Sequence, residues 1–502
     1  MTTRTPEPLL ALAEPTQEHE LGGRAVAAVV GGAIADAMGW ITEFMRGPDS
    51  LERFTGRRRL EGYVAWDKRT GGRFNTYIDH IDEGSYSDDT QLSLCTARSI
   101  EPDGSFNAQY FAKVELPLWT QYARGAGAAV TAAARGAARK RTTWNSNFFT
   151  YTLRRRRTDY RDAGSNGAAM RSAPLAIANH GDPERLSTAV WRSAVVTHGH
   201  PRAIVGALLI AEALRRVLTQ ETVEQHAFLP DLLDFVVDIR PPDNEEFDDW
   251  LRRWNQDGRD FGEELQAATD EAVDALGVAA DSRHEDISGV LRRLGCYDPA
   301  SKGSGIATVA AALALFYRWG GNFKACVEQA VNAIGTDTDT IGAMAAGLTA
   351  AHAGMSELPE AWTVQLQDYE YLNRTGEALA AIGNRTAIGW DLAPAIELPE
   401  QAPAERQWQS IDFERAGLLS ARQRIVHPLF GRGWIRNVQT QEIRRKRGGT
   451  ITLIDVAFDM GQSIRLRTRQ GLLFTDAHQI AIARAREYNS PEDIASEGRL
   501  RL

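Results

Sequence analysis

The feature that most restricts the fold of this chain is the spacing of its apolar residues between Leu21 and about Ala395. Alanine-rich segments of helical length carry apolar residues three and four positions apart, and glycine and proline separate these segments. Residues 204–218, 305–319 and 323–334 show the pattern clearly. Alternation of the kind that predicts strands is nearly absent here. We therefore expect an all-α body, preceded by a disordered tail at residues 1–20.

The composition changes after Asp391. Three prolines, Pro394, Pro399 and Pro403, lie close together there, as is typical of a linker between domains. Residues 424–474 then contain β-branched, alternating runs separated by glycines, which predict a small five-stranded barrel. The predicted order is a helical domain at 21–395, a linker at 396–412, a β-barrel at 413–476 and a tail at 477–502.

Composition narrows the class of protein. With 43% hydrophobic and 25% charged residues, the chain matches a soluble globular protein. Its 3 cysteines are too scattered for a disulfide framework, which favours a reducing compartment. The apolar stretch 25–41 is short for a membrane span and contains Asp36, so we expect a buried helix. The first residues lack the pattern of a secretory signal. We expect a cytoplasmic protein without a membrane partner.

The charge of −9 is unevenly distributed along the chain. Residues 413–476 hold 12 Arg and Lys against 5 Asp and Glu, a balance of +7 that leaves −16 for the remainder. A basic barrel could engage nucleic acid or an acidic protein partner. The alternative is a module that docks within the same molecule.

Two short acidic motifs, residues 87–90 (SDDT) and 336–340 (TDTDT), each stand where a helix is expected to begin. Ser87 suits the N-cap of the first helix, and Gly335 suits the end of the helix before the second motif. Helix starts favour anions, so the aspartates could simply be caps. Capping explains about one aspartate per motif, however, and the two motifs hold four.

If the two motifs converge in the fold, their four carboxylates repel one another unless cations compensate the charge. Carboxylate and hydroxyl oxygens form a hard ligand set that suits magnesium, manganese or calcium rather than zinc. These residues therefore favour a site for two divalent cations, and capping remains the alternative.

Four segments of the chain occur in the order known from one enzyme family: 31–44 (GGAIADAMGWITEF), 87–90, 164–175 (GSNGAAMRSAPL) with 197–207, and 335–348 (GTDTDTIGAMAAGL). Over about residues 21–395 the chain resembles the ADP-ribosylglycohydrolase family, which includes the hydrolase that reactivates dinitrogenase reductase. Two departures occur, because Ala35 replaces the glycine before Asp36 and Thr336 replaces the second glycine before Asp337.

The resemblance implies a compact all-α body with two Mg²⁺ ions, or possible Mn²⁺ substitutes, at one end of an ADP-ribose cleft. It implies that Glu43 is mobile and gates the second metal. We expect Asp89 or Asp339 to activate water, and Glu43 to act as a gate or acid/base partner. The implied metal ligands are Ser87, Asp88, Asp89, Asp337, Asp339 and Thr340.

The predicted substrate-binding residues are Gly164, Ser165, Asn166, Gly167, Met170 and His198. Residues 164–167 precede a predicted helix, where backbone N–H groups can approach a diphosphate closely, although an interhelical turn is the alternative. His198 and His200 suit contact with ribose or adenine, or alternatively capping and packing. Asp36 is expected to be buried and supporting. The arginine run 154–157 suits phosphate or protein recognition, although such runs are usually solvated faces.

The segment 426–473 resembles the Tudor-like or SH3-like barrels at the C-termini of bacterial DNA helicases. The leading hypothesis is a magnesium-dependent hydrolase that removes ADP-ribose from a modified protein, nucleic acid or small molecule. A non-catalytic ADP-ribose-binding module is the second hypothesis, and an immunity protein against an ADP-ribosylating toxin is the third.

Overall fold

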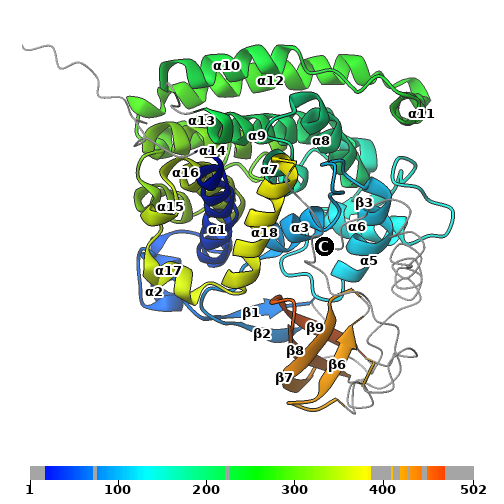
Figure 1. Cartoon of the computed structure of the whole chain (residues 1–502), viewed down its shortest axis with the longest axis vertical. Coiled ribbons are helices and arrows are strands. Elements are labelled where there is room, and N and C mark those ends of the chain that lie inside the picture. Colours follow the sequence, from blue (N-terminus) through cyan, green and yellow to red (C-terminus); the bar gives the residue numbers. More distant parts are fainter. Residues whose placement is uncertain are drawn as a thin grey trace, which may run out of the picture.

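The structure is a computed structural model (Figure 1). It describes residues 17–71, 76–220, 223, 225–385, 409–410, 419–427, 429–443 and 449–469. Most of the predicted N-terminal tail and linker, and all of the predicted C-terminal tail, lie outside the described residues. The predicted tail is too long, because the first helix already begins at Gln17. Glutamine and glutamate are good helix formers, so residues 17–20 continue the helix.

The body is mainly helical, as predicted. Its α-helices are α1 (Gln17–Glu43), α2 (Pro48–Thr55), α3 (Asp88–Ala97), α4 (Ala108–Tyr110), α5 (Leu116–Trp119), α6 (Ala128–Ala137), α7 (Ala173–Ala178), α8 (Pro183–Thr197), α9 (Pro201–Thr219), α10 (Gln225–Val237), α11 (Glu245–Trp254), α12 (Phe261–Ala280), α13 (Ile287–Arg293), α14 (Gly305–Trp319), α15 (Phe323–Val331), α16 (Thr338–Ala353), α17 (Glu360–Gln365) and α18 (Tyr369–Gly383).

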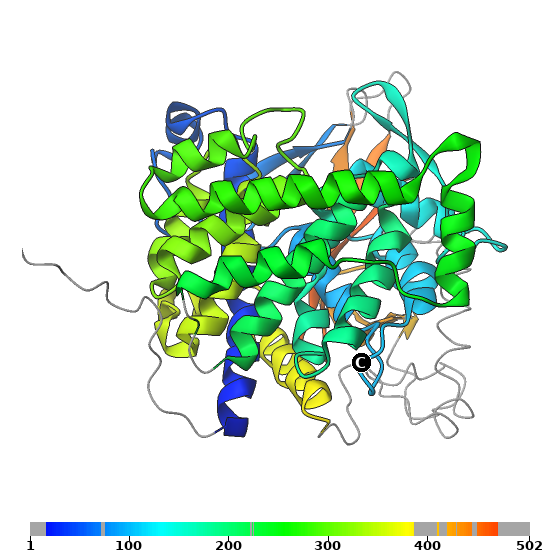
Figure 2. The same cartoon turned by 90° about the horizontal axis from the view of Figure 1, so that it is seen from above.

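Helix α1 lies at the centre of the body beside α16 and α18 (Figure 1). Its segment Leu21–Glu43 is long and apolar enough to cross a membrane, but 89% of the most apolar window is buried inside the protein. The prediction of a buried helix over residues 25–41 is therefore confirmed. On the other side of the body, α10 and α12 form an outer layer over α9 and α14, and Figure 2 shows α12 crossing this face.

The expectation of an all-α body is wrong in one respect, because the body also contains two β-hairpins. The first pairs β1 (Trp66–Thr70) with β2 (Tyr77–Ile81), and the second pairs β3 (Thr150–Leu153) with β4 (Arg156–Asp159). These strands have only four or five residues each, and β3 and β4 bury none of their side chains. A strand that short and exposed carries almost no alternating pattern, so periodicity could not reveal it.

The C-terminal region forms an antiparallel sheet, with one parallel pair at its edge. Its strands are β5 (Gln409–Ser410), β6 (Arg424–His427), β7 (Gly431–Glu442), β8 (Thr450–Phe458) and β9 (Ser463–Arg469), in that spatial order. A register shift between Ile435 and Asn437 interrupts the β7–β8 ladder. Strand β5 falls inside the predicted linker. No strand pair closes the sheet among the described residues, so the closed barrel stays a prediction.

The sheet packs against the body beside β1 and β2 (Figure 1). Phe430, which is fully buried, lies 5.5 Å from the ring of Tyr122 and under the guanidinium of Arg98. Buried residues of the sheet belong to the same hydrophobic core as the helices. The face of the sheet that packs on the body therefore shares one continuous hydrophobic core with the helices.

Arginines of the sheet bind the body directly. Arg465 on β9 forms an ion pair with Asp79 on β2 at 2.8 Å and a second one with Asp455 on β8. Arg467 donates to the carbonyl of Ala123. Part of the positive charge that distinguishes this region in the sequence thus serves docking within the molecule.

Candidate active site

The first acidic motif starts a helix as predicted. Ser87 is the N-cap of α3, and its hydroxyl accepts a hydrogen bond from the backbone N–H of Asp89 at 3.2 Å. The aspartates of this motif are therefore not needed as caps. Asp88 instead places its carboxylate against Gly125, since a Cβ built on that glycine would lie 2.5 Å from Asp88 Oδ1. Any larger residue at Gly125 would collide with the carboxylate.

The second acidic motif starts α16, but not in the way predicted. Helix α15 ends at Val331 with Asn332 as its C-cap, so Gly335 lies in the connection, where its φ of 105° suits glycine. Asp337 occupies the N-cap position of α16 without making a side-chain cap bond. Its Oδ2 accepts a hydrogen bond from Asn166 Nδ2 at 2.8 Å instead. Capping thus fails to account for Asp337.

Asp36 of α1 holds the start of α3 in place. Its carboxylate is fully buried and accepts hydrogen bonds from the backbone N–H groups of Ser87 and Thr90, at 3.1 and 3.0 Å. It also accepts one from the Thr90 hydroxyl at 2.6 Å. A carboxylate is favourable at a helix N-terminus because of the exposed N–H groups there. This supports the expectation that Asp36 is a buried, supporting residue.

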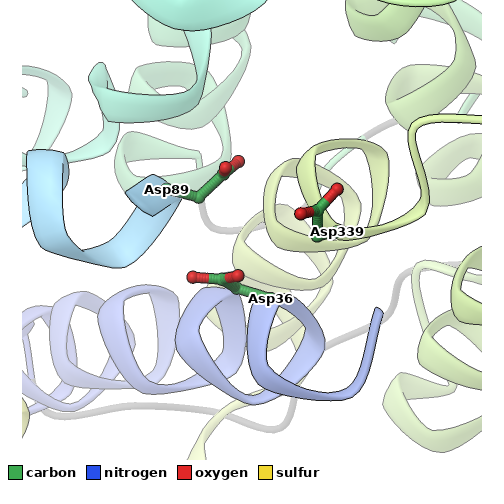
Figure 3. Close-up of side chains that lie close together, drawn as sticks. All are labelled: Asp36, Asp89 and Asp339. Carbon is green, nitrogen blue, oxygen red and sulfur yellow. The ribbon is translucent and has the colours of Figure 1, made fainter. Parts of the chain in front are cut away.

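A close approach of α1 to α16 brings the two acidic motifs together. A Cβ on Gly39 would lie only 2.7 Å from the carbonyl oxygen of Thr338, so only glycine allows this backbone contact. As a result, carboxylate oxygens of Asp36, Asp89 and Asp339 lie within 4.8 Å of one another. Figure 3 shows these side chains pointing from three helices into a shared space. We call Asp36, Glu43, Asp88, Asp89, Asp337 and Asp339 the acidic cluster.

The acidic cluster is electrostatically strained. Burial raises the pKa of Asp88, Asp89 and Asp339 well above the usual aspartate value, and neighbouring carboxylates raise it further. The pKa of Glu43 is raised to about 7, mainly by burial and next by the negative charge of Asp337, although the residue is only half-buried. Like charges at this density require compensation. The cluster could therefore hold a metal ion.

One atom in the cluster supports this directly. Asp89 Oδ1 is buried and has no hydrogen-bond partner among the described residues. A buried, unpartnered carboxylate oxygen is costly, and a bound cation would satisfy it. The surrounding donors are carboxylates and the hydroxyls of Ser87 and Thr340, both buried. Oxygen donors of this kind suit a hard divalent cation.

Two lysines beside the cluster were not predicted. Lys68 on β1 places its ammonium 4.2 Å from the ring centre of Trp40 and 4.6 Å from that of Phe44. Burial lowers its pKa, while Asp88, Glu43 and Asp339 raise it. Lys302 donates to the carbonyl oxygen of Glu43 at 3.2 Å. Lys68 could not be found from the sequence pattern, because its hairpin was not predicted.

The loop 164–167 is held from both sides by backbone hydrogen bonds. Asn166 N–H donates to the carbonyl of Gly303, and Gly305 N–H donates to that of Gly164, both at 3.0 Å. Residues Asn166–Arg171 then form a 3₁₀ helix. Through its side chain, Asn166 also reaches the acidic cluster, which connects the loop to Asp337.

His198 supports this loop from beneath. Its ring is fully buried, with Nε2 2.9 Å from Ser165 Oγ and Nδ1 2.7 Å from Thr197 Oγ1. Burial lowers its pKa to about 3. A Cβ on Gly167 would lie 2.8 Å from His198 Cε1, so the loop rests directly on the imidazole. His198 therefore lies close to the predicted diphosphate loop as a neutral positioning residue.

Two further predicted residues have defined places. His200 is the N-cap of α9 and accepts from the N–H of Arg202 at 3.0 Å, which confirms the capping alternative. Met170 lines a small apolar cavity of about 60 Å³ together with Asp89. Arg171, next to it, received no role in the sequence, although its fully buried guanidinium donates to the carbonyls of Gly167 and Ser193. It fixes the 3₁₀ helix to α8.

The fold and the site together define a helical protein with a buried acidic cluster to which α1, α3 and α16 contribute. The sequence pattern of the family described as ADP-ribosylglycohydrolase matches residues 17–388. This chain therefore belongs to the ADP-ribosylglycohydrolase family.

Individual relatives are distant. The chain is 24% identical over 343 residues to the ADP-ribosyl-[dinitrogen reductase] glycohydrolase of Rhodospirillum rubrum, which spans 68% of this chain and 90% of that protein. It is 26% identical over 241 residues to human ADP-ribosylhydrolase ARH3, which spans 44% of this chain and 60% of ARH3. A solved chain titled "ADP-ribosylglycohydrolase-related protein complex" matches 73% of this chain and 99% of its own length, with 22% identity and a TM-score of 0.46.

Proposed function

We propose that this protein is a magnesium-dependent hydrolase that cleaves the glycosidic bond between ADP-ribose and a modified target. The observation that carries the proposal is the convergence of Asp36, Asp89 and Asp339 within 4.8 Å, with a buried oxygen of Asp89 left unpartnered. Family membership supplies the substrate class. The proposal places the enzyme in the cytoplasm.

Ser87, Asp88, Asp89, Asp337, Asp339 and Thr340 would hold two Mg²⁺ ions, or Mn²⁺ in their place. When bound, the ions would orient the ribose hydroxyls and lower the pKa of a bound water. Asp36 has a different part, because its oxygens already accept bonds from the start of α3. By holding the start of α3, Asp36 positions the ligands of the first motif close to those of α16.

The reaction breaks the bond between C1 of the ribose and the nitrogen or oxygen of the target. Water adds to C1, and the leaving atom takes up a proton. Asp89 or Asp339 accepts the proton of the attacking water. Glu43, at the end of α1, acts as the gate or as the acid/base partner. The pinned loop 164–167 binds the diphosphate, but not through the backbone N–H groups of Gly164 and Asn166, because these donate to Asp162 and Gly303.

The decisive experiment offers the purified protein targets with arginine-linked, serine-linked and base-linked ADP-ribose, in Mg²⁺ and in chelator. We expect Mg²⁺-dependent release from at least one linkage. Asp89→Asn and Asp339→Asn should each lower the rate by about 100-fold or more, as expected for loss of a catalytic group. Asp274→Asn changes an exposed aspartate of α12 in the same way and should leave the rate unchanged.

Two results would contradict the proposal. If ADP-ribose binds but no linkage is cleaved, the protein is a non-catalytic ADP-ribose-binding module. If cleavage persists in chelator, the metal assignment is wrong. A third question, whether the protein neutralises an ADP-ribosylating toxin, is answered by testing whether it releases ADP-ribose from that toxin's target.

A further inference from the structure

A second hollow of the molecule lies away from the acidic cluster, between α6 and the β3–β4 hairpin. This groove has a volume of about 740 Å³. Among the described residues that line it, three are arginines, three are aromatic and none is acidic: Arg135, Arg139, Arg157, Phe148, Phe149 and Tyr151. Figure 1 shows α6 beside β3 on the side of the molecule away from α2 and α15.

The positive charge extends beyond the groove. Lys140 and Arg141 follow the end of α6, and Arg154, Arg155 and Arg156 form the tip of the hairpin; all are exposed. The nearest acidic residues in the sequence, Asp159 and Asp162, pair with Arg161 and Arg259 instead. In a chain of net charge −9, this is a strong local concentration of positive charge.

The hairpin tip supports a functional role. Arg154 and Arg155 have φ angles of 47° and 69°, so both central residues of the turn are in the left-handed region. Asparagine and glycine are the usual residues there, because other side chains are strained. Cations at the C-terminal end of α6 stabilise that helix, which explains Arg135. No such effect explains arginines at the strained turn, and strained positions cluster where a protein binds something.

The aromatic residues give the groove flat, rigid surfaces. Phe148 and Phe149 pack on the buried Tyr160, at ring distances of 4.8 and 5.3 Å. Tyr151 lies 6.0 Å from Phe149 and is half-buried, so part of its ring stays accessible. Asn147 fixes the base of the hairpin to α6 by donating to the carbonyl of Ala133 at 2.9 Å. The groove is therefore preformed.

We propose that this groove binds single-stranded nucleic acid, with the arginines on the phosphates and Tyr151 stacked on a base. Arginines interleaved with accessible aromatic rings are the combination that single-strand binding uses. An acidic protein segment would pair with the arginines but would leave the aromatic surfaces unused. The proposal does not depend on the hydrolase activity, because no residue of the acidic cluster lines the groove.

Helix α6 connects the groove with the predicted diphosphate loop. Near the N-terminal end of α6, Val130 packs against Gly167, since a Cβ on that glycine would lie 3.3 Å from Val130 Cγ2. The same helix therefore borders both the groove and the predicted diphosphate loop. A strand held in the groove would contact the helix that also packs against the predicted diphosphate loop, so a nucleic acid could itself carry the group that is removed.

The test measures binding of the full-length protein to a fluorescent oligonucleotide of about 12 nucleotides, as DNA and as RNA, by anisotropy. The main variant combines Arg135→Gln, Arg139→Gln and Arg157→Gln. Its matched control combines Arg46→Gln, Arg53→Gln and Arg57→Gln, which removes the same charge from exposed arginines on and around α2. The groove variant should bind at least about 10-fold more weakly, and the salt dependence of log K should flatten by about 2.

Tyr151→Leu separates nucleic acid from other polyanions. It should weaken oligonucleotide binding by about 10-fold, because a base–aromatic stack is lost. Binding of inorganic polyphosphate should not change, and Tyr151→Phe should restore oligonucleotide binding. The proposal is overturned if the groove variant binds like its control. It is also overturned if Tyr151→Leu has no effect and polyphosphate binds as tightly as the oligonucleotide.

Discussion

The acidic cluster and the interface beneath the C-terminal sheet both bury charged side chains, but they balance the charge in opposite ways. Under the sheet, the fully buried Arg98 forms an ion pair with the fully buried Glu115 at 2.8 Å. Its guanidinium also donates to Gln462 Oε1 in the turn before β9. The charges of Arg98 and Glu115 therefore compensate each other inside the protein.

The acidic cluster gathers carboxylates from α1, α3 and α16 at one point, and Asp89 Oδ1 has no hydrogen-bond donor within the part of the chain that the structure describes. Folding tolerates buried charge in both regions, but only the Arg98–Glu115 pair is compensated by an opposite charge within the protein. Whether a buried charge is compensated therefore separates structural from functional charge in this protein. A buried ion pair whose charges compensate each other stabilises the contact between elements, whereas a buried carboxylate without a compensating charge indicates a ligand-binding site.

We expect the largest effect from removing the buried ion pair between Arg98 and Glu115. Glu115→Gln keeps the shape of the side chain but leaves the Arg98 guanidinium buried without its counter-charge. We expect the free energy of unfolding to fall by about 3–5 kcal/mol. Urea unfolding followed by circular dichroism measures this. Glu328→Gln, at a pair that is part exposed, is the control and should cost about 1 kcal/mol or less. An equal loss in both variants would contradict the comparison.

The second prediction concerns metal binding to the acidic cluster, where a cation would compensate the carboxylates. Mg²⁺ at about 100 times its Kd should stabilise the wild-type protein by about 2.7 kcal/mol, because it binds only the folded site. Asp89→Asn should lose this stabilisation, while NaCl at equal ionic strength should not reproduce it. Thermal unfolding with and without chelator measures the effect. Equal stabilisation of wild type and Asp89→Asn would show that Mg²⁺ acts elsewhere.

The pattern of apolar residues was enough to predict the helical body, and hydroxyl and carboxylate residues at two helix starts were enough to predict the two halves of the acidic cluster. Ser87 could be predicted as a cap because N-capping depends on neighbouring residues alone. Asp36 could be predicted as buried, because a lone carboxylate in an apolar helix needs partners. Its partners, Ser87 and Thr90, lie in another helix and could not be predicted.

What the sequence could not supply is the set of contacts between distant segments. Asn166 was predicted to bind substrate, but its bond to Asp337 depends on two loops meeting in the fold. The basic charge of the C-terminal region indicated a partner. The structure gives part of that charge an intramolecular role, because Arg465 pairs with Asp79. Composition measures how much charge a segment has, but not which surface it faces.

The smallest expected effect tests whether the acidic cluster is strained without metal. Burial and neighbouring carboxylates raise the pKa of Asp339, so its protonated form is favoured in the folded protein. Its contribution to stability is therefore present at low pH and is lost as pH rises through the raised pKa. Asp339→Asn removes the charge, and its Oδ1 can still accept the bond from the Thr340 N–H.

In chelator at about pH 8, Asp339→Asn should therefore raise the free energy of unfolding, because the variant lacks the charge that burial and the neighbouring carboxylates disfavour. At about pH 5 the gain should shrink, because the wild-type carboxyl is then protonated in larger part. In Mg²⁺ the order should reverse, since only the wild type keeps the full ligand set. Urea unfolding at the two pH values measures this, with Asp274→Asn as the exposed control. A loss of stability that is the same at both pH values would mean that Asp339 is a structural residue, and that this cluster is balanced after all.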